Sequence, residues 1–479
     1  MTRRPNVVLI VSDDQGPWAL GAAGNHEIRT PVLDDLAARG VRLERFFCAS
    51  PVCSPARASM LTGRIPSSHG VHDYLDGAHV GTASRDHLAD QPTLTDALAD
   101  AGYRLGLSGK WHLGASDVPR PGFVHWYALE GGGSPYRDAV MYRGGAPEHV
   151  TDYLTDVIAD DAISFIDAEQ QHEAPFFLAL NFTAPHKPFA GQHPEEYTAL
   201  YRDCAFETCP QEQAHPWLQT LDAAPIGGEA DTREALIGYF AAVTAMDAAI
   251  GRVLDRLRVH GIEDNTIVVF LSDNGFSCGQ HGFWGKGNGT FPMNMYDESV
   301  MVPFIVSAPR MLPAGEVRDE LLSAYDLPAT LLELLRLPHE GFETGPGRSF
   351  AGMLRGDAPA GTEPADRAVV VHSEYGPVRM IRTADRKYVH RFPYGPHELY
   401  DLAADPRERT NLIDDPSRAD EVARMRRMLT EWFAEHARPG ADGAALPVKG
   451  SGQIRPLAGD PLGAFGAPVW DGASTSSLP

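Results

Sequence analysis

The sequence is poor in cysteine and contains no long apolar run. Its 479 residues include five cysteines at irregular spacings and no Cys-x-x-Cys pair, which excludes a disulfide-stapled fold and argues against a structural zinc site. No apolar stretch approaches the length of a membrane span, and the N-terminal run Val7–Val11 is shorter than the apolar core of a signal peptide. The sequence therefore predicts a cytoplasmic protein that does not insert into membranes.

Basic residues are also scarce relative to acidic ones. The chain has 41 Lys and Arg against 64 Asp and Glu, which gives a formal net charge of −23 at pH 7. Such a surface repels phosphate backbones and anionic lipids, so we expect neither nucleic acid nor membrane partners. Since 43% of the residues are apolar, the chain can build a large core. An anionic substrate would need a local cationic pocket.

Apolar runs alternate with amphipathic helical patterns over residues 1–355. A helix is expected from a Thr151 cap to Ile166, and another from Leu236 to Leu257 with Gly261 as its stop. The alternation predicts an α/β fold with a mostly parallel central sheet flanked by helices, forming one large domain. Three short apolar runs are expected as buried strands of that sheet: Val7–Val11, Phe176–Phe182 and Thr266–Leu271.

The composition changes near residue 355. Residues 356–366 are rich in Gly, Pro and Ala and are predicted to form a linker. Residues 367–436 predict a small α+β subdomain with an antiparallel sheet, because short strand patterns at 369–372 and 380–383 precede a helical pattern at 421–436. Residues 437–479 predict an extended tail. Apolar side chains in that tail suggest contact with a second subunit in a homo-oligomer: Phe465, Val469 and Trp470.

Oxygen-bearing side chains follow two of the predicted strands. Asp13 and Asp14 come directly after the first strand, and Asp273 and Asn274 follow the strand that ends near Leu271. Ligands of parallel sheets bind beyond the carboxyl ends of the strands, and carboxylate and amide oxygens suit Ca²⁺ or Mg²⁺. Asp and Asn also end strands simply as turn formers, so neither pair alone specifies a metal site.

A reactive group falls between these pairs in the sequence Cys53-Ser54-Pro55-Ala56-Arg57, which continues to Leu-Thr-Gly-Arg at residues 61–64. Pro55 suits the first turn of a helix, so Cys53 is expected just ahead of a helix N-terminus. The free N–H groups there favour a bound oxyanion. Arg57 lies one turn into the helix and can reach back toward the cysteine.

These motifs resemble those of the formylglycine-dependent, type I sulfatases of the alkaline-phosphatase-like superfamily, and the resemblance extends from Pro5 to Pro406. It is also carried by the segments 109–114 (GKWHLG), 184–188 (APHKP) and 279–287 (GQHGFWGKG). In that family a maturation enzyme reads Cys-x-Pro-x-Arg and oxidises the cysteine to formylglycine. Ala56 departs from the serine often found in the motif, which bears on recognition by that enzyme but removes no catalytic group.

The resemblance implies a set of site residues, and it makes residues 1–355 the catalytic domain. The implied catalytic residues are Cys53 as formylglycine, Arg57, Lys110, His112, His186 and Lys286. The implied ligands of Ca²⁺, with Mg²⁺ or Mn²⁺ as alternatives, are Asp13, Asp14, Cys53, Asp273 and Asn274. The implied substrate-binding residues are Lys110, His186, His281 and Lys286. In the implied reaction a hydroxyl of the hydrated aldehyde attacks sulfur, His186 or Lys286 protonates the departing alcohol, and His112 takes a proton as sulfate is released.

The resemblance also implies a function, a sulfuric ester hydrolase acting on a sulfated small molecule or oligosaccharide. Glycosaminoglycan-type carbohydrate sulfates are favoured because tryptophans lie in or near the motifs and aromatic faces suit sugar rings. Those tryptophans are Trp18, Trp111, Trp126 and Trp284. The alternatives are a hydrolase of N-sulfoglucosamine, choline sulfate or aryl sulfates, and a phosphonate monoesterase or phosphodiesterase, although Gln15 and Asn274 favour the sulfatase. With Cys53 unmodified, the chain would be a sulfoglycan-binding protein without turnover.

Overall fold

A mixed eleven-stranded sheet is the centre of the computed structural model, which describes residues 4–221, 224–357, 367–374, 376–457 and 462–465. In spatial order its strands are β14 (Glu316–Arg318), β2 (Val41–Phe47), β13 (Met301–Ser307), β10 (Thr266–Ser272), β1 (Asn6–Ser12), β7 (Phe176–Asn181), β3 (Arg104–Gly109), β4 (Phe123–Leu129), β5 (Ala139–Arg143) and β6 (Ala146–Val150), with β15 (Leu322–Ser323) beside β2. The strands from β10 to β4 are parallel to one another, which confirms the predicted mostly parallel sheet.

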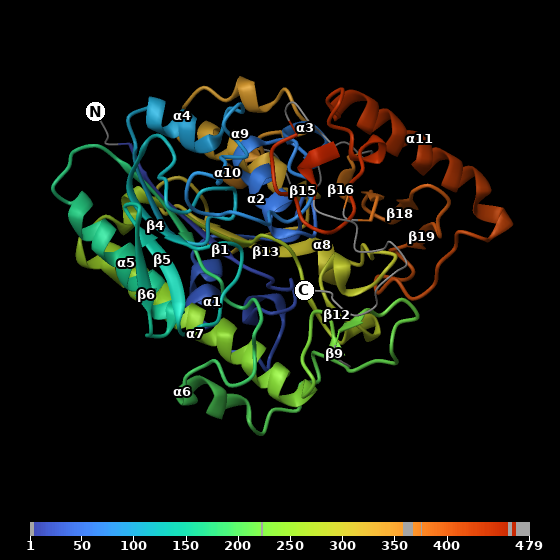
Figure 1. Cartoon of the computed structure of the whole chain (residues 1–479), viewed down its shortest axis with the longest axis horizontal. Coiled ribbons are helices and arrows are strands. Elements are labelled where there is room, and N and C mark those ends of the chain that lie inside the picture. Colours follow the sequence, from blue (N-terminus) through green and yellow to red (C-terminus); the bar gives the residue numbers. More distant parts are fainter. Residues whose placement is uncertain (1–3, 222–223, 358–366, 375, 458–461, 466–479) are drawn as a thin grey trace.

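Helices cover both faces of this sheet (Figure 1). Along β1, Val8 and Ile10 face one helical layer, whereas Val7, Leu9 and Val11 face the other. Every residue of β1 is buried, which explains why its sequence is a continuous apolar run. The first layer contains α1 (Pro31–Ala38), α5 (Leu154–Glu169) and α7 (Thr232–Val259). The second contains α2 (Cys53–Thr62), α4 (Leu94–Asp100), α9 (Leu327–Leu334) and α10 (Ala351–Arg355).

The start of α5 differs from the prediction. Thr151 does not cap this helix, because the chain stays extended through Tyr153 and the first helical residue is Leu154. The Leu154 N–H donates to the carbonyl of Tyr136, and the Tyr153 hydroxyl pairs with His193. Contacts with distant loops therefore set the boundary of α5, and the local capping pattern does not.

The long helix α7 agrees with the prediction and extends it by one turn at its N-terminus. The Asp231 carboxylate accepts the N–H groups of Arg233 and Glu234, and Gly261 follows the helix with a φ of 64°. Among the described residues α7 is the one helix long and apolar enough to cross a membrane, but 83% of its apolar window is buried in the fold. Its apolar character is accounted for by its place in the core.

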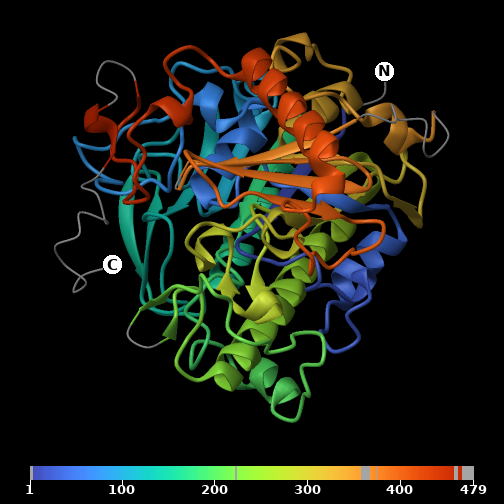
Figure 2. The ribbon, with the colours of Figure 1, turned by 90° about the vertical axis from the view of Figure 1, so that its right-hand side faces the viewer.

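The smaller C-terminal unit is a four-stranded antiparallel sheet covered by one helix, as predicted (Figure 2). Its strands are β16 (Val369–Ser373), β17 (Val378–Arg382), β18 (Arg386–Arg391) and β19 (Glu398–Asp401), and its helix is α11 (Ala419–His436). Met425, Leu429 and Phe433 of α11 pack against the apolar face of this sheet. Of the predicted linker, residues 358–366 lie outside the described residues.

The segment after α11 packs back on the large domain. Gln453 is fully buried and forms hydrogen bonds with the loop at residues 70–76, including a bond from its amide nitrogen to the carbonyl of Gly70. Phe465 is buried in a cluster with Val448 and Leu457 of its own chain, and its contact with a second subunit stays a prediction. Val469 and Trp470 lie outside the described residues.

The hydroxyl of Tyr239 ties α7 to the loop that follows β1. It donates to the carbonyl of Asp14 at 2.9 Å and accepts the N–H of Gly16 at 3.0 Å, and the side chain is fully buried. These bonds satisfy two backbone groups that have no access to water. The packing of α7 thus fixes the backbone that carries the strand-end acids.

Replacing Tyr239 by Phe should lower the free energy of unfolding by about 1–3 kcal/mol, because two buried polar groups lose their partner. Urea unfolding followed by circular dichroism measures the change. Tyr142→Phe is the matched control, since among the described residues that partly buried hydroxyl hydrogen-bonds only to the Glu130 carboxylate, and its loss should cost less than about 0.5 kcal/mol. Equal stability of the Tyr239→Phe variant and the wild type would contradict this role.

Candidate active site

The register of β1 and β10 brings the two strand-end pairs together. Ser12 lies opposite Ser272 in the parallel ladder, so Asp13 and Asp14 leave the sheet beside Asp273 and Asn274. The Asp14 N–H donates to Asp273 Oδ1 at 3.3 Å, and Asn274 Nδ2 donates to Asp14 Oδ1 at 2.7 Å. Ligand atoms of four residues lie within 4.8 Å of one another: Asp13, Asp14, Cys53 and Asp273. The expected convergence of the two pairs is confirmed.

A helix begins at the motif, as Pro55 predicted, but Cys53 is the first residue of α2 and does not lie just ahead of it. Its thiol faces the acids. Its Sγ donates to Asp13 Oδ1 at 3.5 Å and accepts from Lys286 Nζ at 2.9 Å. The side chain is 5% exposed, so the reactive position lies at the bottom of the site. Lys286 follows the short strand β12 (Trp284–Gly285), which places its ammonium opposite the N-terminus of α2.

Each of the three carboxylates pairs with one cation. Lys110 Nζ donates to Asp13 Oδ2 at 2.6 Å, Lys286 Nζ donates to Asp14 Oδ1 at 2.6 Å, and Arg57 Nε donates to Asp273 Oδ2 at 2.9 Å. The Arg57 Nη2 atom is buried without a hydrogen-bond partner among the described residues. A buried guanidinium nitrogen with a free donor is suited to an anionic ligand.

Burial and ion pairing compete in setting the protonation states. Burial alone would raise the pKa of Asp13, but the positive charge of Lys110 and its neighbours lowers it, so this carboxylate stays ionised. Burial, assisted by Asp13, raises the pKa of Asp273 to about 6. Burial also raises the pKa of the Cys53 thiol to about 12. The unmodified thiol is therefore protonated at neutral pH and is a weak nucleophile.

His112 follows β3 and is held by the loop after α3 (Pro66–His69). Its Nε2 lies 3.1 Å from the carbonyl of Leu75, and its buried Nδ1 has no hydrogen-bond partner among the described residues. Donation from Nε2 to that carbonyl leaves Nδ1 with a free lone pair. Burial, reinforced by Lys110, holds the pKa of His112 well below its usual value, so the imidazole is neutral. This ring can accept a proton.

His186 follows β7 and lies near the acids. Its Nδ1 lies 2.7 Å from the carbonyl of Lys187, and its Nε2 lies 3.8 Å from Asp14 Oδ2. Burial lowers the pKa of His186, although Asp13 and Asp14 oppose the shift. His186 therefore lies beside Asp14.

A run of three glycines at the carboxyl end of β4 is part of the site, and it was not predicted. A Cβ atom on Gly132 would overlap the His112 imidazole, and one on Gly133 would lie 3.2 Å from Cε1 of His186. A Cβ on Gly131 would lie 3.3 Å from Cδ2 of His79. Only residues without side chains let this loop approach the rings so closely. The sequence signal was Gly131-Gly132-Gly133 directly after a strand.

Two sequence expectations about substrate contacts meet a different environment. The His281 imidazole lies 3.3 Å from the Glu298 carboxylate and stacks on Tyr296 with ring centroids 3.8 Å apart, so it is engaged within the protein and its substrate contact stays a prediction. The expectation that tryptophan faces contact a sugar is wrong for three of the four rings, because they are at most 5% exposed and lie in the core: Trp111, Trp126 and Trp284. Trp18 stacks on Tyr239.

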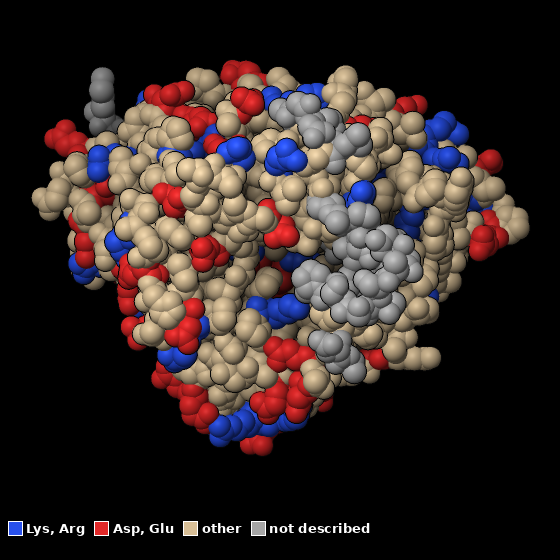
Figure 3. All heavy atoms as spheres, in the orientation of Figure 1, with Lys and Arg blue, Asp and Glu red and all other residues tan. Residues whose placement is uncertain are grey.

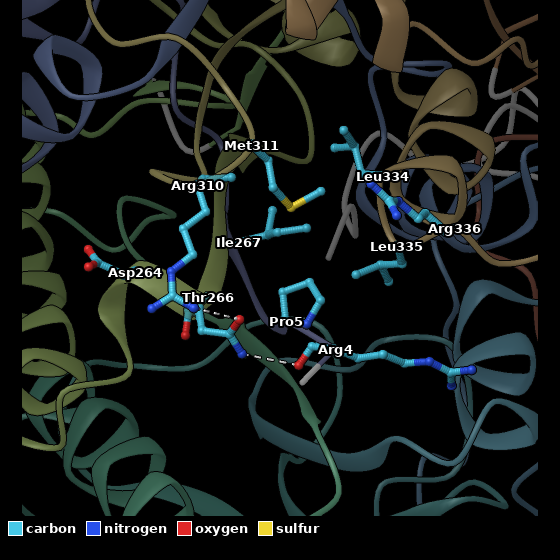
Figure 4. Close-up of a pocket in the computed structure, with 12 residues that line it drawn as sticks. Arg4, Pro5, Asp264, Thr266, Ile267, Arg310, Met311, Leu334, Leu335 and Arg336 are labelled. Carbon is cyan, nitrogen blue, oxygen red and sulfur yellow. Dashed lines mark hydrogen bonds between the residues drawn. The ribbon is translucent and has the colours of Figure 1, made fainter. Parts of the chain in front are cut away.

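A separate cavity of about 370 Å³ opens at the amino-terminal end of β1 and β10 (Figure 4). Pro5, Thr266 and Leu335 contribute to its lining, and Arg310 extends toward Asn265 at its edge. None of the expected catalytic residues lines it. Ligands of parallel sheets bind at the carboxyl ends of strands, so this cavity lies at the opposite end from the reactive groups.

The arrangement defines a class of protein. Buried acids that can hold a divalent cation, a nucleophile position at a helix N-terminus and three buried cations together suit the hydrolysis of an anionic ester. Lys and Arg are interspersed with Asp and Glu over the face in Figure 3, and charged atoms of both signs lie inside its central hollow. The cations that an anion requires are present at the site, where Arg57, Lys110 and Lys286 lie beside the carboxylates.

Comparison with known proteins gives the family. The family model described as sulfatase matches residues 5–337, and the model for the C-terminal part of N-sulphoglucosamine sulphohydrolase matches residues 279–435. An ulvan-active sulfatase of Formosa agariphila is 29% identical, with 86% of this chain and 78% of the relative covered. An N-acetylglucosamine-6-O-sulfatase of Bacteroides thetaiotaomicron is 27% identical, with 90% of this chain and 86% of the relative covered.

A solved structure in complex with its substrate D-glucosamine-2-N,6-O-disulfate has the same fold, with a TM-score of 0.76 and 24% identity over 92% of this chain and 99% of that one. The chain belongs to the sulfatase family, within the alkaline-phosphatase-like superfamily, and is a hydrolase of that family.

Gly132→Ala should lower kcat for every sulfate ester at least about tenfold, because the added methyl group displaces the His112 ring and small misplacements of catalytic groups are costly. Steady-state kinetics with 4-nitrophenyl sulfate measures the effect. Gly341→Ala is the matched control, since a Cβ atom at that position would have no neighbour within 4 Å. Full activity of Gly132→Ala with an unchanged melting temperature would show that the close approach to His112 has no catalytic importance.

Proposed function

We propose that this protein hydrolyses sulfate monoesters of carbohydrates to an alcohol and inorganic sulfate, with formylglycine at position 53 and Ca²⁺ held by the strand-end acids. The observation that carries the proposal is the position of Cys53, whose Sγ lies between the Asp13 carboxylate and the Lys286 ammonium at the N-terminus of α2. A nucleophile there faces both the ligands of a hard cation and a positive charge for the substrate anion.

The residues present fit a divalent cation. Asp13, Asp14 and Asp273 offer clustered carboxylate oxygens, and Asn274 offers an amide oxygen that accepts from Lys286 Nζ at 3.5 Å. In the structure each of these carboxylates forms an ion pair with one of the three nearby cations. A bound divalent cation would neutralise the carboxylates, polarise the nucleophile and leave the cations for the sulfate group.

The charged side chains have distinct roles toward the substrate. Arg57, Lys110 and Lys286 bind the sulfate oxygens and stabilise charge that develops in the transition state. The formylglycine hydrate supplies two hydroxyls on one carbon, so that the first can attack sulfur and the second can drive the release of sulfate. A serine or a thiol at position 53 lacks the second hydroxyl.

The two histidines divide the proton transfers. The oxygen of the departing alcohol takes its proton from His186, whose charged form Asp13 and Asp14 favour, or from the Lys286 ammonium. His112 accepts a proton at Nδ1, because its Nε2 is already bound to the carbonyl of Leu75. A neutral imidazole is required for that step, and burial keeps His112 neutral.

The choice of carbohydrates rests on the relatives. An ulvan-active sulfatase, an N-acetylglucosamine-6-O-sulfatase and a structure holding a disulfated glucosamine all resemble this chain over most of its length. The match to the C-terminal part of N-sulphoglucosamine sulphohydrolase makes a sulfamate the second candidate. Choline sulfate, aryl sulfates and phosphonate monoesters remain alternatives for the assay.

A panel of substrates tests this proposal. We expect kcat/KM for at least one monosulfated sugar to exceed that for a phenylphosphonate monoester by about 100-fold or more, equivalent to about 2.7 kcal/mol of transition-state stabilisation. N-sulfoglucosamine, choline sulfate and 4-nitrophenyl sulfate complete the panel, with sulfate release measured by ion chromatography. A preference for the phosphonate would move the function to the monoesterase branch of the superfamily.

Modification of Cys53 is tested separately. In active preparations the tryptic peptide that contains Cys53 should be lighter by about 18 Da, the difference between a thiol and an aldehyde side chain, and activity should rise with this fraction when a maturation enzyme is co-expressed. Cys53→Ser should give at most one turnover per molecule. Cys204→Ser is the control and should keep full activity, because Cys204 lies beside Glu27 and away from the strand-end acids. Sustained turnover by Cys53→Ser would exclude the two-hydroxyl mechanism.

A further inference from the structure

Three histidines lie along one short strip of backbone. Gly131 lies against His79, Gly132 against His112 and Gly133 against His186, in sequence order. Consecutive Cα atoms are about 3.8 Å apart, so the three rings contact neighbouring positions of the same loop. The ring centroids of His79 and His112 are 6.1 Å apart. His79 therefore belongs to the same wall of the site as the two expected catalytic histidines.

Exposure differs along this wall. Cys53 and His112 are each 5% exposed, whereas His79 is only half-buried. A sulfate ester that reaches Cys53 must place its sulfate group at the bottom of the site and keep its larger alcohol portion toward the opening. His79 lies on the outer part of that path, one ring away from His112.

The His79 imidazole is available to a ligand. Its backbone carbonyl accepts the Ser116 N–H at 2.7 Å, which anchors the residue, but its ring forms no hydrogen bond with any described residue. Neither the metal site nor the proposed proton transfers use it. A polar ring that is held by its backbone, and that has no hydrogen-bond partner in the part of the chain that the structure describes, is suited to contact the substrate.

We propose that His79 is a specificity-determining residue, whose imidazole forms a hydrogen bond with an uncharged hydroxyl on the alcohol portion of the sulfate ester. This inference rests on the proposed carbohydrate sulfatase function and deepens it. It assigns to His79 the recognition of the sugar, while Arg57, Lys110 and Lys286 recognise the sulfate.

The surroundings of His79 favour a neutral hydroxyl over a second anionic group. Burial lowers the pKa of His79, although the carboxylates of Asp76 and Glu130 oppose that shift, so the ring is neutral and can both donate and accept. The same two carboxylates repel a further sulfate on the substrate. The structure thus predicts a preference for monosulfated over disulfated sugars at this position.

The test compares His79→Leu, His79→Gln and the wild type on phenyl sulfate and on the monosulfated sugar that the wild type cleaves fastest. His79→Leu should lower kcat/KM for the sugar about tenfold, mainly through KM, and lower that for phenyl sulfate by less than about threefold, since phenol carries no further hydroxyl. His79→Gln keeps a donor and an acceptor and should recover part of the loss. His149→Ala, an exposed histidine on β6, is the control and should behave as the wild type.

Two results would overturn the inference: equal losses on both substrates for His79→Leu, or an unchanged KM for the sugar. Because His79→Gln preserves the hydrogen-bonding groups, a loss in both variants on both substrates would indicate a structural role instead. The wild-type measurements alone decide the proposed function, since an enzyme that cleaves phenyl sulfate but none of the sulfated sugars would refute the carbohydrate assignment whatever the variants do.

Discussion

The pairing of three buried carboxylates with three cations at the carboxyl ends of β1 and β10 is the constraint on which the rest of the structure depends. Removing one partner of a buried pair leaves an uncompensated charge, which costs about 3–5 kcal/mol. Asp13 and Lys110 are both fully buried, so neither can be relieved by water. The strand register, the start of α2 and the position of β12 together bring these six groups into contact.

Support for the site comes from distant parts of the chain. Ser54, next to the nucleophile position, accepts the N–H of Leu75 through its hydroxyl, and the carbonyl of Leu75 holds His112. The loop that carries Leu75 is in turn fixed by Gln453, which bonds to Gly70, His72, Tyr74 and Asp76. A fully buried glutamine near the end of the chain is therefore a structural part of the active site, although it contacts no reacting group.

The features that were predictable from the sequence have local causes. The strands β1 and β10 could be recognised because strands buried on both faces are continuously apolar. The place of the acids was predictable because ligands of parallel sheets bind at the carboxyl ends of the strands. The start of α2 was marked by Pro55. The rest depends on contacts between distant segments. Bonds from the loop after β4, and not a Thr151 cap, set the start of α5, and three of the four tryptophans are buried in the core. The role of Gly131–Gly133 is visible only in the folded chain, where three other loops bring histidines against them. No local pattern encodes such encounters.

The burial of Cys53 and its dependence on Gln453 set an order of events during synthesis. Any enzyme that reads Cys-x-Pro-x-Arg as a linear motif needs an extended segment, whereas in the folded chain these residues form the first turns of a buried helix. The roughly 400 residues between Cys53 and Gln453 take about 20 to 80 seconds to translate at usual rates. During that interval the loop beside Ser54 lacks the hydrogen bonds that Gln453 makes to it. The late position of Gln453 in the sequence thus leaves a period during synthesis in which the loop beside Cys53 is not yet held in place.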